Sequence, residues 1–204
     1  MNMITPVTVE TINNLAPNAG MVLTNFDYSS ATDANSLAQL ILDEQTQETS
    51  WRGATKGGIN AQENREWWSP EFDGKRMPYK GEKQFSTANP KITGTLVEFT
   101  PENVKAVSGI ATITTDGSIT TVQPRGSIQE GDYFDNVVWV TNNGPDGLYL
   151  VELKNALCTS GMNSQSADKD IGTLPFEFSG HADNVVYNDE LPIKYLFFAA
   201  AQEG

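Results

Sequence analysis

The sequence contains few side chains of the kinds that carry out catalysis, and their spacing does not build a catalytic centre. The one histidine, His181, follows Ser179 and precedes Asp183. These three residues are neighbours in sequence, and no serine has the glycine-flanked setting of a hydrolase nucleophile. The one cysteine, Cys158, ends an apolar segment without cationic neighbours, which favours a buried structural thiol. We therefore expect His181 to lie in a polar loop or an interface, and we expect no enzymatic activity.

Acidic pairs and paired glycines are also poor matches to ligand-binding motifs. The pairs that offer oxygen atoms to a cation are Asp132 with Asp135 and Asp168 with Asp170. Neither pair follows the spacing of an EF-hand loop with its final glutamate, so solvated turns are favoured over a calcium site. Lys56 precedes Gly57-Gly58, whereas the lysine of a phosphate-binding loop follows its glycines. The sequence predicts no cofactor and no metal.

Composition limits the class of protein further. The chain has 204 residues, enough for one domain with a buried core, and we treat residues 1–204 as a single domain. Thirteen basic and 26 acidic residues give a formal charge of −13, which argues against binding along a nucleic-acid backbone. No segment approaches the ~20 apolar residues that span a bilayer, and the N-terminus lacks the features of a secretory signal. We expect a soluble protein without a membrane partner, folded in a reducing compartment.

The charge is unevenly distributed along the chain. Residues 1–51 contain six acids and no Lys or Arg. Residues 52–91 carry eight bases and five acids, a net of +3, whereas residues 92–204 carry five bases and fifteen acids, a net of −10. A basic segment between acidic flanks could complement the acidic surface of another copy. A solvated strand pair of mixed charge is the alternative that the pattern leaves open.

Most local patterns predict β-strands. Strand signals cover residues 91–99, 109–122, 134–141, 148–157, 173–180 and 192–198. Within this set, Asp116-Gly117 predicts a hairpin turn, and the turn-rich residues 142–147 predict a second hairpin. The expected fold class is therefore mainly β, a β-sandwich or partly closed barrel with one short flanking α-helix and a long extended loop or hairpin.

The flanking helix is expected to begin after Thr100. Thr100 is a good N-cap, Pro101 suits the first helical position, and Gly109 ends the helix after about two turns. Val104 and Val107 share one face, on which we expect the helix to pack. A second candidate helix covers residues 33–45, where the apolar positions with helical spacing are Leu37, Leu40 and Ile41.

Residues 51–88 are difficult to place in a compact core. Strand-like segments at 55–66 and 79–88 flank an expected tip at 67–78, which begins with two tryptophans. Long excursions from compact domains are usually functional or disordered, and paired tryptophans are unusual in disordered chains.

We predict that residues 51–88 form an inter-subunit arm, because Trp and Arg are enriched at interface hot spots. The candidate contact residues are Trp51, Arg52, Lys56, Trp67, Trp68, Lys75, Arg76, Tyr79 and Lys80. Two alternatives remain open: a sugar-stacking platform of Trp67, Trp68 and Tyr79, or a tryptophan packed under its own hairpin.

Several motifs, taken in order, resemble a known family. They are Asn18-Ala-Gly-Met-Val-Leu, Asn25-Phe-Asp, Gly53-Ala-Thr-Lys-Gly-Gly-Ile, Asp73-Gly-Lys-Arg-Met-Pro with Lys80-Gly, Thr93-Gly-Thr-Leu-Val-Glu-Phe-Thr-Pro-Glu-Asn-Val and Leu174-Pro-Phe-Glu-Phe-Ser-Gly-His. Together they resemble the major tail proteins, the tail tube subunits of long-tailed, non-contractile bacteriophages. The resemblance extends from about residue 18 to 198. Residues 33–47 look like an insertion, so the resemblance implies nothing about them.

The resemblance implies a β-sandwich with a flanking helix and no catalytic residues. It implies that six copies form a ring, that rings stack into the tail tube, and that the arm reaches neighbouring subunits and the adjacent ring. The expected partners are copies of the chain and the tape-measure, tail-tip and tail-terminator proteins. DNA would pass through the lumen without specific binding, because an acidic lumen repels phosphates. The protein would be assembled in the host cytoplasm and located in the virion tail.

Other function classes remain as alternatives to the tail tube subunit. One is a non-catalytic binding module, either a sugar-binding β-sandwich or a capsid decoration protein. Another is a related tube protein of a tail-like bacteriocin or of a secretion system.

Overall fold

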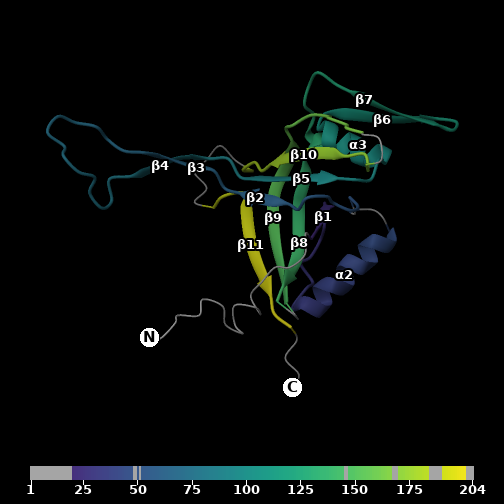
Figure 1. The fold of residues 1–204 in the computed structure, drawn as a ribbon, viewed down its shortest axis with the longest axis horizontal. Coiled ribbons are helices and arrows are strands. Elements are labelled where there is room, and N and C mark those ends of the chain that lie inside the picture. Colours follow the sequence, from purple (N-terminus) through teal and green to yellow (C-terminus); the bar gives the residue numbers. More distant parts are fainter. Residues whose placement is uncertain are drawn as a thin grey trace.

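Seven strands form one hydrogen-bonded system joined through the long strand β9 (Gly147–Cys158) (Figure 1). A computed structural model describes residues 20–47, 50, 52–144, 147–166, 170–183 and 190–200. The strands in pairing order are β1 (Met21–Thr24), β8 (Phe134–Asn143), β9, β10 (Leu174–Ser179), β5 (Lys91–Leu96) and β2 (Asn60–Gln62), and β11 (Ile193–Phe198) also pairs with β9. All of these pairings are antiparallel.

Strand β9 divides this system into two layers. Its first part pairs with β8 and β11, and its last two residues, Leu157 and Cys158, pair with β10. Apolar side chains of both layers form one core, whose largest fully buried members include Ile92, Leu96, Leu153, Leu174 and Phe178. The predicted mainly β fold is confirmed in its sandwich form, and the sheets do not close into a barrel.

Helix α2 (Ala34–Gln47) covers the other face of β1, β8 and β9 (Figure 1). Its buried residues Leu37 and Ile41 pack with Leu23, Val138 and Leu150 in a second core cluster. The helical stripe at residues 33–45 therefore predicted both the helix and its buried face. Because α2 covers one face and the second layer covers the other, the central strands have few exposed side chains.

The short helix α3 (Pro101–Ser108) forms where the sequence predicts it. The Thr100 side chain accepts a hydrogen bond from the backbone N–H of Asn103 at 3.1 Å, and Pro101 occupies the first turn. Val107 is fully buried and Val104 is partly buried against the sandwich core. Gly109 ends the helix with φ of +74°, in close contact with the backbone of Cys158. Within the described residues, no helix is long and apolar enough to cross a membrane.

Two thin ribbons extend from opposite sides of this body (Figure 1). One is β3 (Arg65–Trp68) with β4 (Gln84–Ala88), and the other is β6 (Ala111–Asp116) with β7 (Ile119–Pro124). The hairpin predicted at Asp116-Gly117 is confirmed, as is the β8–β9 hairpin. A 3₁₀ turn, η1 (Glu130–Asp132), leads into β8.

The cap of α3 gives a stability prediction. Replacing Thr100 by Ala leaves the N–H of Asn103 without its acceptor, and we expect the free energy of unfolding to fall by about 1 kcal/mol. Urea denaturation followed by circular dichroism measures this change. Thr100→Ser, which keeps the hydroxyl oxygen, is the control and should stay near wild type. Equal stability of Thr100→Ala and wild type would contradict the assigned cap.

Candidate functional site: the arm and its base

The structure narrows the predicted arm to residues 65–88. Residues 55–62 run along the body instead, because Thr55 bridges to Leu96 and β2 pairs with β5. We call residues 65–88 the arm and residues 69–83 the arm tip. Trp67 and Trp68 lie in β3 rather than in the expected tip, and Tyr79 lies in the arm tip rather than in a strand.

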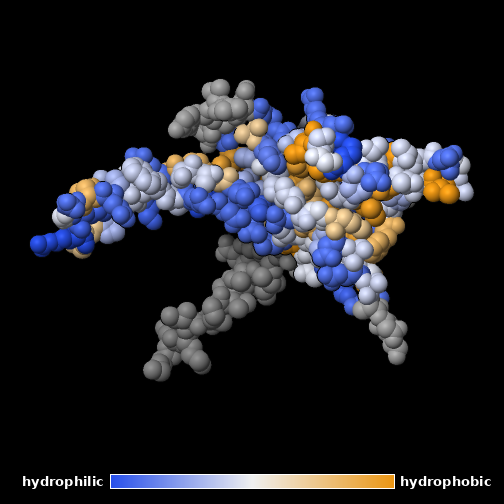
Figure 2. Space-filling model, turned by 90° about the horizontal axis from the view of Figure 1, so that it is seen from above, coloured by the Kyte–Doolittle hydropathy of each residue, from blue (hydrophilic) through white to orange (hydrophobic). Residues whose placement is uncertain are grey.

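The arm is a two-stranded ribbon that buries almost none of its side chains. Every residue of β3 is exposed, and in β4 four of five are exposed. Of fourteen exposed large apolar side chains among the described residues, six lie on the arm: Trp67, Trp68, Phe72, Met77, Tyr79 and Phe85. Figure 2 shows apolar patches along the arm and at its end, far from the body. An isolated ribbon has no core, so apolar side chains concentrated on it indicate a contact surface.

A partly buried ion pair orders the arm tip. Lys75 Nζ lies 2.9 Å from Oε2 of Glu82 and donates to the carbonyl oxygen of Pro70 at 3.1 Å. The Glu82 carboxylate also accepts the backbone N–H of Tyr79 at 3.2 Å. The hydrogen bond from Lys75 is the main cause that lowers the pKa of Glu82 below its usual range. The side chain of Glu82 is 3% exposed, so this pair stabilises the turn geometry of the arm tip.

Lys75, one of the predicted contact residues, has partners within its own arm tip. Its side chain is only 18% exposed and is held within the arm tip, so Lys75 contributes to local structure. Arg76, Tyr79 and Lys80 are exposed, as is Lys83. Among the described residues, no ion pair involves Arg76, Lys80 or Lys83. The roles of Arg76, Tyr79 and Lys80 in inter-subunit contact remain predictions.

Arg52 and Lys56, the remaining basic residues predicted to contact other subunits, precede the arm in the chain. Arg52 Nε donates to Oγ1 of Thr24 at 2.7 Å, and the guanidinium lies 5.7 Å from the centre of the Phe134 ring. Burial lowers the pKa of Arg52, so this side chain belongs to the body of its own chain. Lys56 forms an ion pair with Asp170 at 2.7 Å, with both side chains about half exposed. Trp51 lies outside the described residues.

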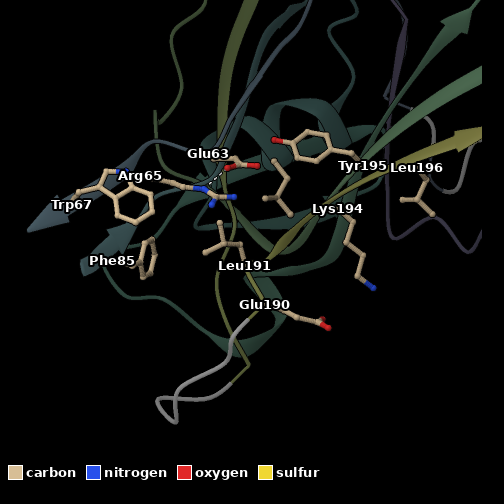
Figure 3. A pocket seen from close by; sticks show the side chains of 10 residues that line it. Glu63, Arg65, Trp67, Phe85, Glu190, Leu191, Lys194, Tyr195 and Leu196 are labelled. Atoms are coloured by element: carbon tan, nitrogen blue, oxygen red, sulfur yellow. Dashed lines mark hydrogen bonds and ion pairs between the residues drawn. The ribbon is translucent and has the colours of Figure 1, made fainter. Parts of the chain in front are cut away.

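A groove of about 740 Å³ lies between the base of the arm and strand β11 (Figure 3). We call it the arm-base groove. Its apolar lining includes Trp67, Phe85 and Leu191, and the rings of Trp67 and Phe85 meet edge to face with centres 6.0 Å apart. Tyr195 lines the opposite wall, and burial together with the nearby Glu63 raises its pKa to about 12.

The aromatic residues of the arm-base groove are not those of the sugar-stacking platform that the sequence suggested. Trp67 pairs with Phe85 and lies near Tyr195, whereas Tyr79 is distant in the arm tip. No sequence signal places Phe85 opposite Trp67, because a register shift between Glu66 and Trp67 sets that pairing. The contribution of Tyr195 depends on tertiary structure, because β11 lies more than a hundred residues further along the chain. Charged side chains complete the lining, including an ion pair between Arg65 and Glu63 at 2.5 Å.

The residues first considered for chemistry have structural partners. His181 Nδ1 lies 2.9 Å from the carbonyl oxygen of Asn155, and its ring meets Tyr133 edge to face. Ser179 Oγ lies 3.0 Å from Oγ1 of Thr159. Asp132 is buried and forms an ion pair with Arg125. Within the described part of the chain, no group of three or more His, Cys, Asp or Glu side chains could hold a metal.

Comparisons with known proteins add no family assignment. No protein-family model matches the sequence, and a search of curated proteins finds no match. Function is therefore inferred from the arm, the groove at its base and the distribution of charge.

The Lys75–Glu82 pair predicts a pH-sensitive arm tip. The pKa of Glu82 is lowered in the folded arm tip, so the stabilisation is present above the ordinary glutamate pKa. It is lost as the pH falls through the lowered pKa. We expect the NMR signal of the Tyr79 amide, which donates to Glu82, to shift in that acidic range.

Glu82→Gln tests the same pair at neutral pH. This variant should speed tryptic cleavage of the arm tip severalfold while the melting temperature of the body stays unchanged. Glu71→Gln, at an exposed arm-tip carboxylate, is the control. Equal cleavage rates for the two variants would contradict the structural role of Glu82.

Proposed function

We propose that this protein is a structural subunit that assembles with copies of itself, of the kind that builds the tail tube of long-tailed, non-contractile bacteriophages. The observation that carries this proposal is the arm, a ribbon that exposes six large apolar side chains and has no core of its own. Exposing apolar side chains to water costs free energy, and burying them against a partner removes that cost.

Charge supports copies of the same chain as the partner. The arm, residues 65–88, carries five bases and four acids, a net of +1, whereas residues 92–204 have a net charge of −10. The arm projects from one side of the molecule (Figure 1), and its basic side chains would be attracted to the acidic body of the next copy, which is a different surface. When subunits join through two different surfaces, the first and last subunits of the chain each keep one surface unused. Further subunits can therefore add until a ring closes, and rings can stack into a tube.

Three of the six motifs behind the resemblance lie side by side on the body. Asn103, in the motif that ends β5 and starts α3, donates from Nδ2 to the carbonyl oxygens of Arg52 and Glu98. The backbone N–H of Ala54, in the glycine-rich motif, donates to Oε1 of Glu98 at 2.7 Å. The third motif, in β10, pairs along β5. These contacts give the three motifs a common role, which is to hold the segments that precede and follow the arm against the body.

In the proposed assembly, six copies form a ring and stacked rings form the conduit through which DNA leaves the virion. The subunit carries out no catalysis and holds no cofactor. Its further partners are the tape-measure, tail-tip and tail-terminator proteins, and DNA passes without specific binding because the chain is strongly acidic. The protein is located in the virion tail and is assembled in the host cytoplasm.

The arm-base groove favours a second candidate, a sugar-binding module. Aromatic faces bind the apolar faces of sugars, and the charged side chains beside Trp67, Phe85 and Tyr195 would bind hydroxyl groups. We rank this candidate second because the groove accounts for only two of the six apolar side chains exposed on the arm.

Shortening the arm tests the proposed function. Trp68 pairs directly with Gln84, so an Asn-Gly turn can replace residues 69–83 and close a short hairpin. We expect a folded monomer with a melting temperature within about 3 °C of wild type, because the removed residues contribute little to the core. Sedimentation velocity should show that large assemblies are lost. Normal assembly of the shortened protein would contradict the role of the arm.

Trp67→Ala separates the two candidate functions. For an assembly subunit, the variant should weaken self-association without affecting any response on a glycan array. For a sugar-binding module, wild type should bind particular glycans and the variant should lose that binding. Glycan binding that depends on Trp67, in a protein that stays monomeric, would reverse the ranking.

A further inference from the structure

Helix α2 carries acidic residues at the end where its dipole is negative. The helix has no acidic residue in its first turn and no basic residue in its last turn, and its two acids, Asp43 and Glu44, lie in its C-terminal half. The C-terminal end of a helix is the negative end of its dipole, where cations stabilise and anions destabilise. The first 51 residues contain no Lys or Arg. This end of α2 is therefore a site at which a cation from elsewhere would be stabilising.

An apolar groove of about 410 Å³ runs beside the same part of α2. We call it the helix groove. It lies between α2 and the adjacent parts of β1, β8 and β9, and its lining includes Ala38, Ile41, Leu42, Val140 and Leu148. Leu42 is 54% exposed although it borders this groove. The surface thus combines an apolar slot with a negative helix end.

The arm tip has the complementary composition. Met77 is 78% exposed, more than any other large apolar side chain among the described residues, and Arg76 and Lys80 are exposed beside it. Methionine is flexible and fills irregular apolar slots well. The arm tip and α2 lie on opposite sides of the molecule (Figure 1), so the arm tip of the same chain does not reach the helix groove.

We propose that the helix groove is the docking site for the arm tip of a second copy of this chain. Met77 of that copy occupies the groove, and Arg76 and Lys80 lie near Asp43 and the C-terminal end of α2. The inference rests on the proposed self-assembly and adds the surface that receives the arm. It also assigns a role to residues 33–47, about which the family resemblance implies nothing. Each subunit then offers one arm and one helix groove, so the contact propagates from copy to copy.

Disulfide formation between two variants, each with one introduced cysteine, tests the contact directly. Met77→Cys and Leu42→Cys proteins of distinguishable mass are mixed under assembly conditions and oxidised, and the native Cys158 is buried. We expect a disulfide-linked heterodimer in high yield. The matched control pairs Met77→Cys with Ile119→Cys, since Ile119 is 69% exposed on the β6–β7 tip and is therefore more accessible than Leu42. The control pair should give at least tenfold less heterodimer.

A charge exchange provides a second measurement. Arg76→Glu alone and Asp43→Lys alone should each raise the critical concentration for assembly about tenfold, or about 1.4 kcal/mol. Combining both substitutions in one chain should restore it towards wild type. Asp116→Lys, at the β6–β7 tip, is the matched control for Asp43→Lys and should leave the critical concentration unchanged.

The outcomes separate this inference from the proposed function. One possible outcome is that wild type assembles but the Met77→Cys protein links no better to Leu42→Cys than to Ile119→Cys. In the same outcome, the charge exchange does not restore the critical concentration. The docking site is then wrong and self-assembly stands. If wild type stays monomeric at every concentration, both proposals are overturned.

Discussion

The fold depends on the pairing of β9 with strands of both layers. Its first part holds β8 and β11, and its end holds β10, so this one strand joins the two layers that enclose the core. Helix α2 covers the face that the second layer leaves open. Both faces of the central strands are buried, and six of the fourteen exposed large apolar side chains among the described residues lie on the arm. The base of the arm is fixed to this body by the pairing of β2 with β5, the strands that lead into and out of the arm.

The sequence predicted the parts of the structure that depend on local signals. Alternating apolar residues at 174, 176 and 178 predicted β10, the Asp116-Gly117 turn predicted a hairpin, and Thr100 predicted the start of α3. It did not predict contacts that depend on tertiary structure. The pairing of Lys75 with Glu82 requires the path of the arm tip, and the burial of Arg52 requires Thr24 and Phe134 from distant strands. A register shift between Glu66 and Trp67 decides which residues face each other across the arm, and the sequence carries no clear signal for it.

The arm and the body have different physical requirements. The body is a sandwich stabilised by burial, whereas the arm is held at its root, along its hydrogen-bonded ribbon and at the Lys75–Glu82 pair. A stable protein contact generally buries more than about 1,000 Å² in total. A projecting ribbon with apolar side chains along its length can supply much of that area while costing the body nothing in stability. The acidic remainder of the chain repels phosphates, which agrees with the proposed role as a conduit that does not bind DNA.

Electron microscopy of the concentrated wild-type protein tests self-assembly most directly. Negatively stained samples over a range of protein and salt concentrations would show whether the protein forms closed or tubular assemblies. The account predicts rings with a central opening, or hollow tubes of uniform diameter, with the equilibrium shifted towards monomers at low concentration. Dispersed single subunits at every concentration and ionic strength would contradict it.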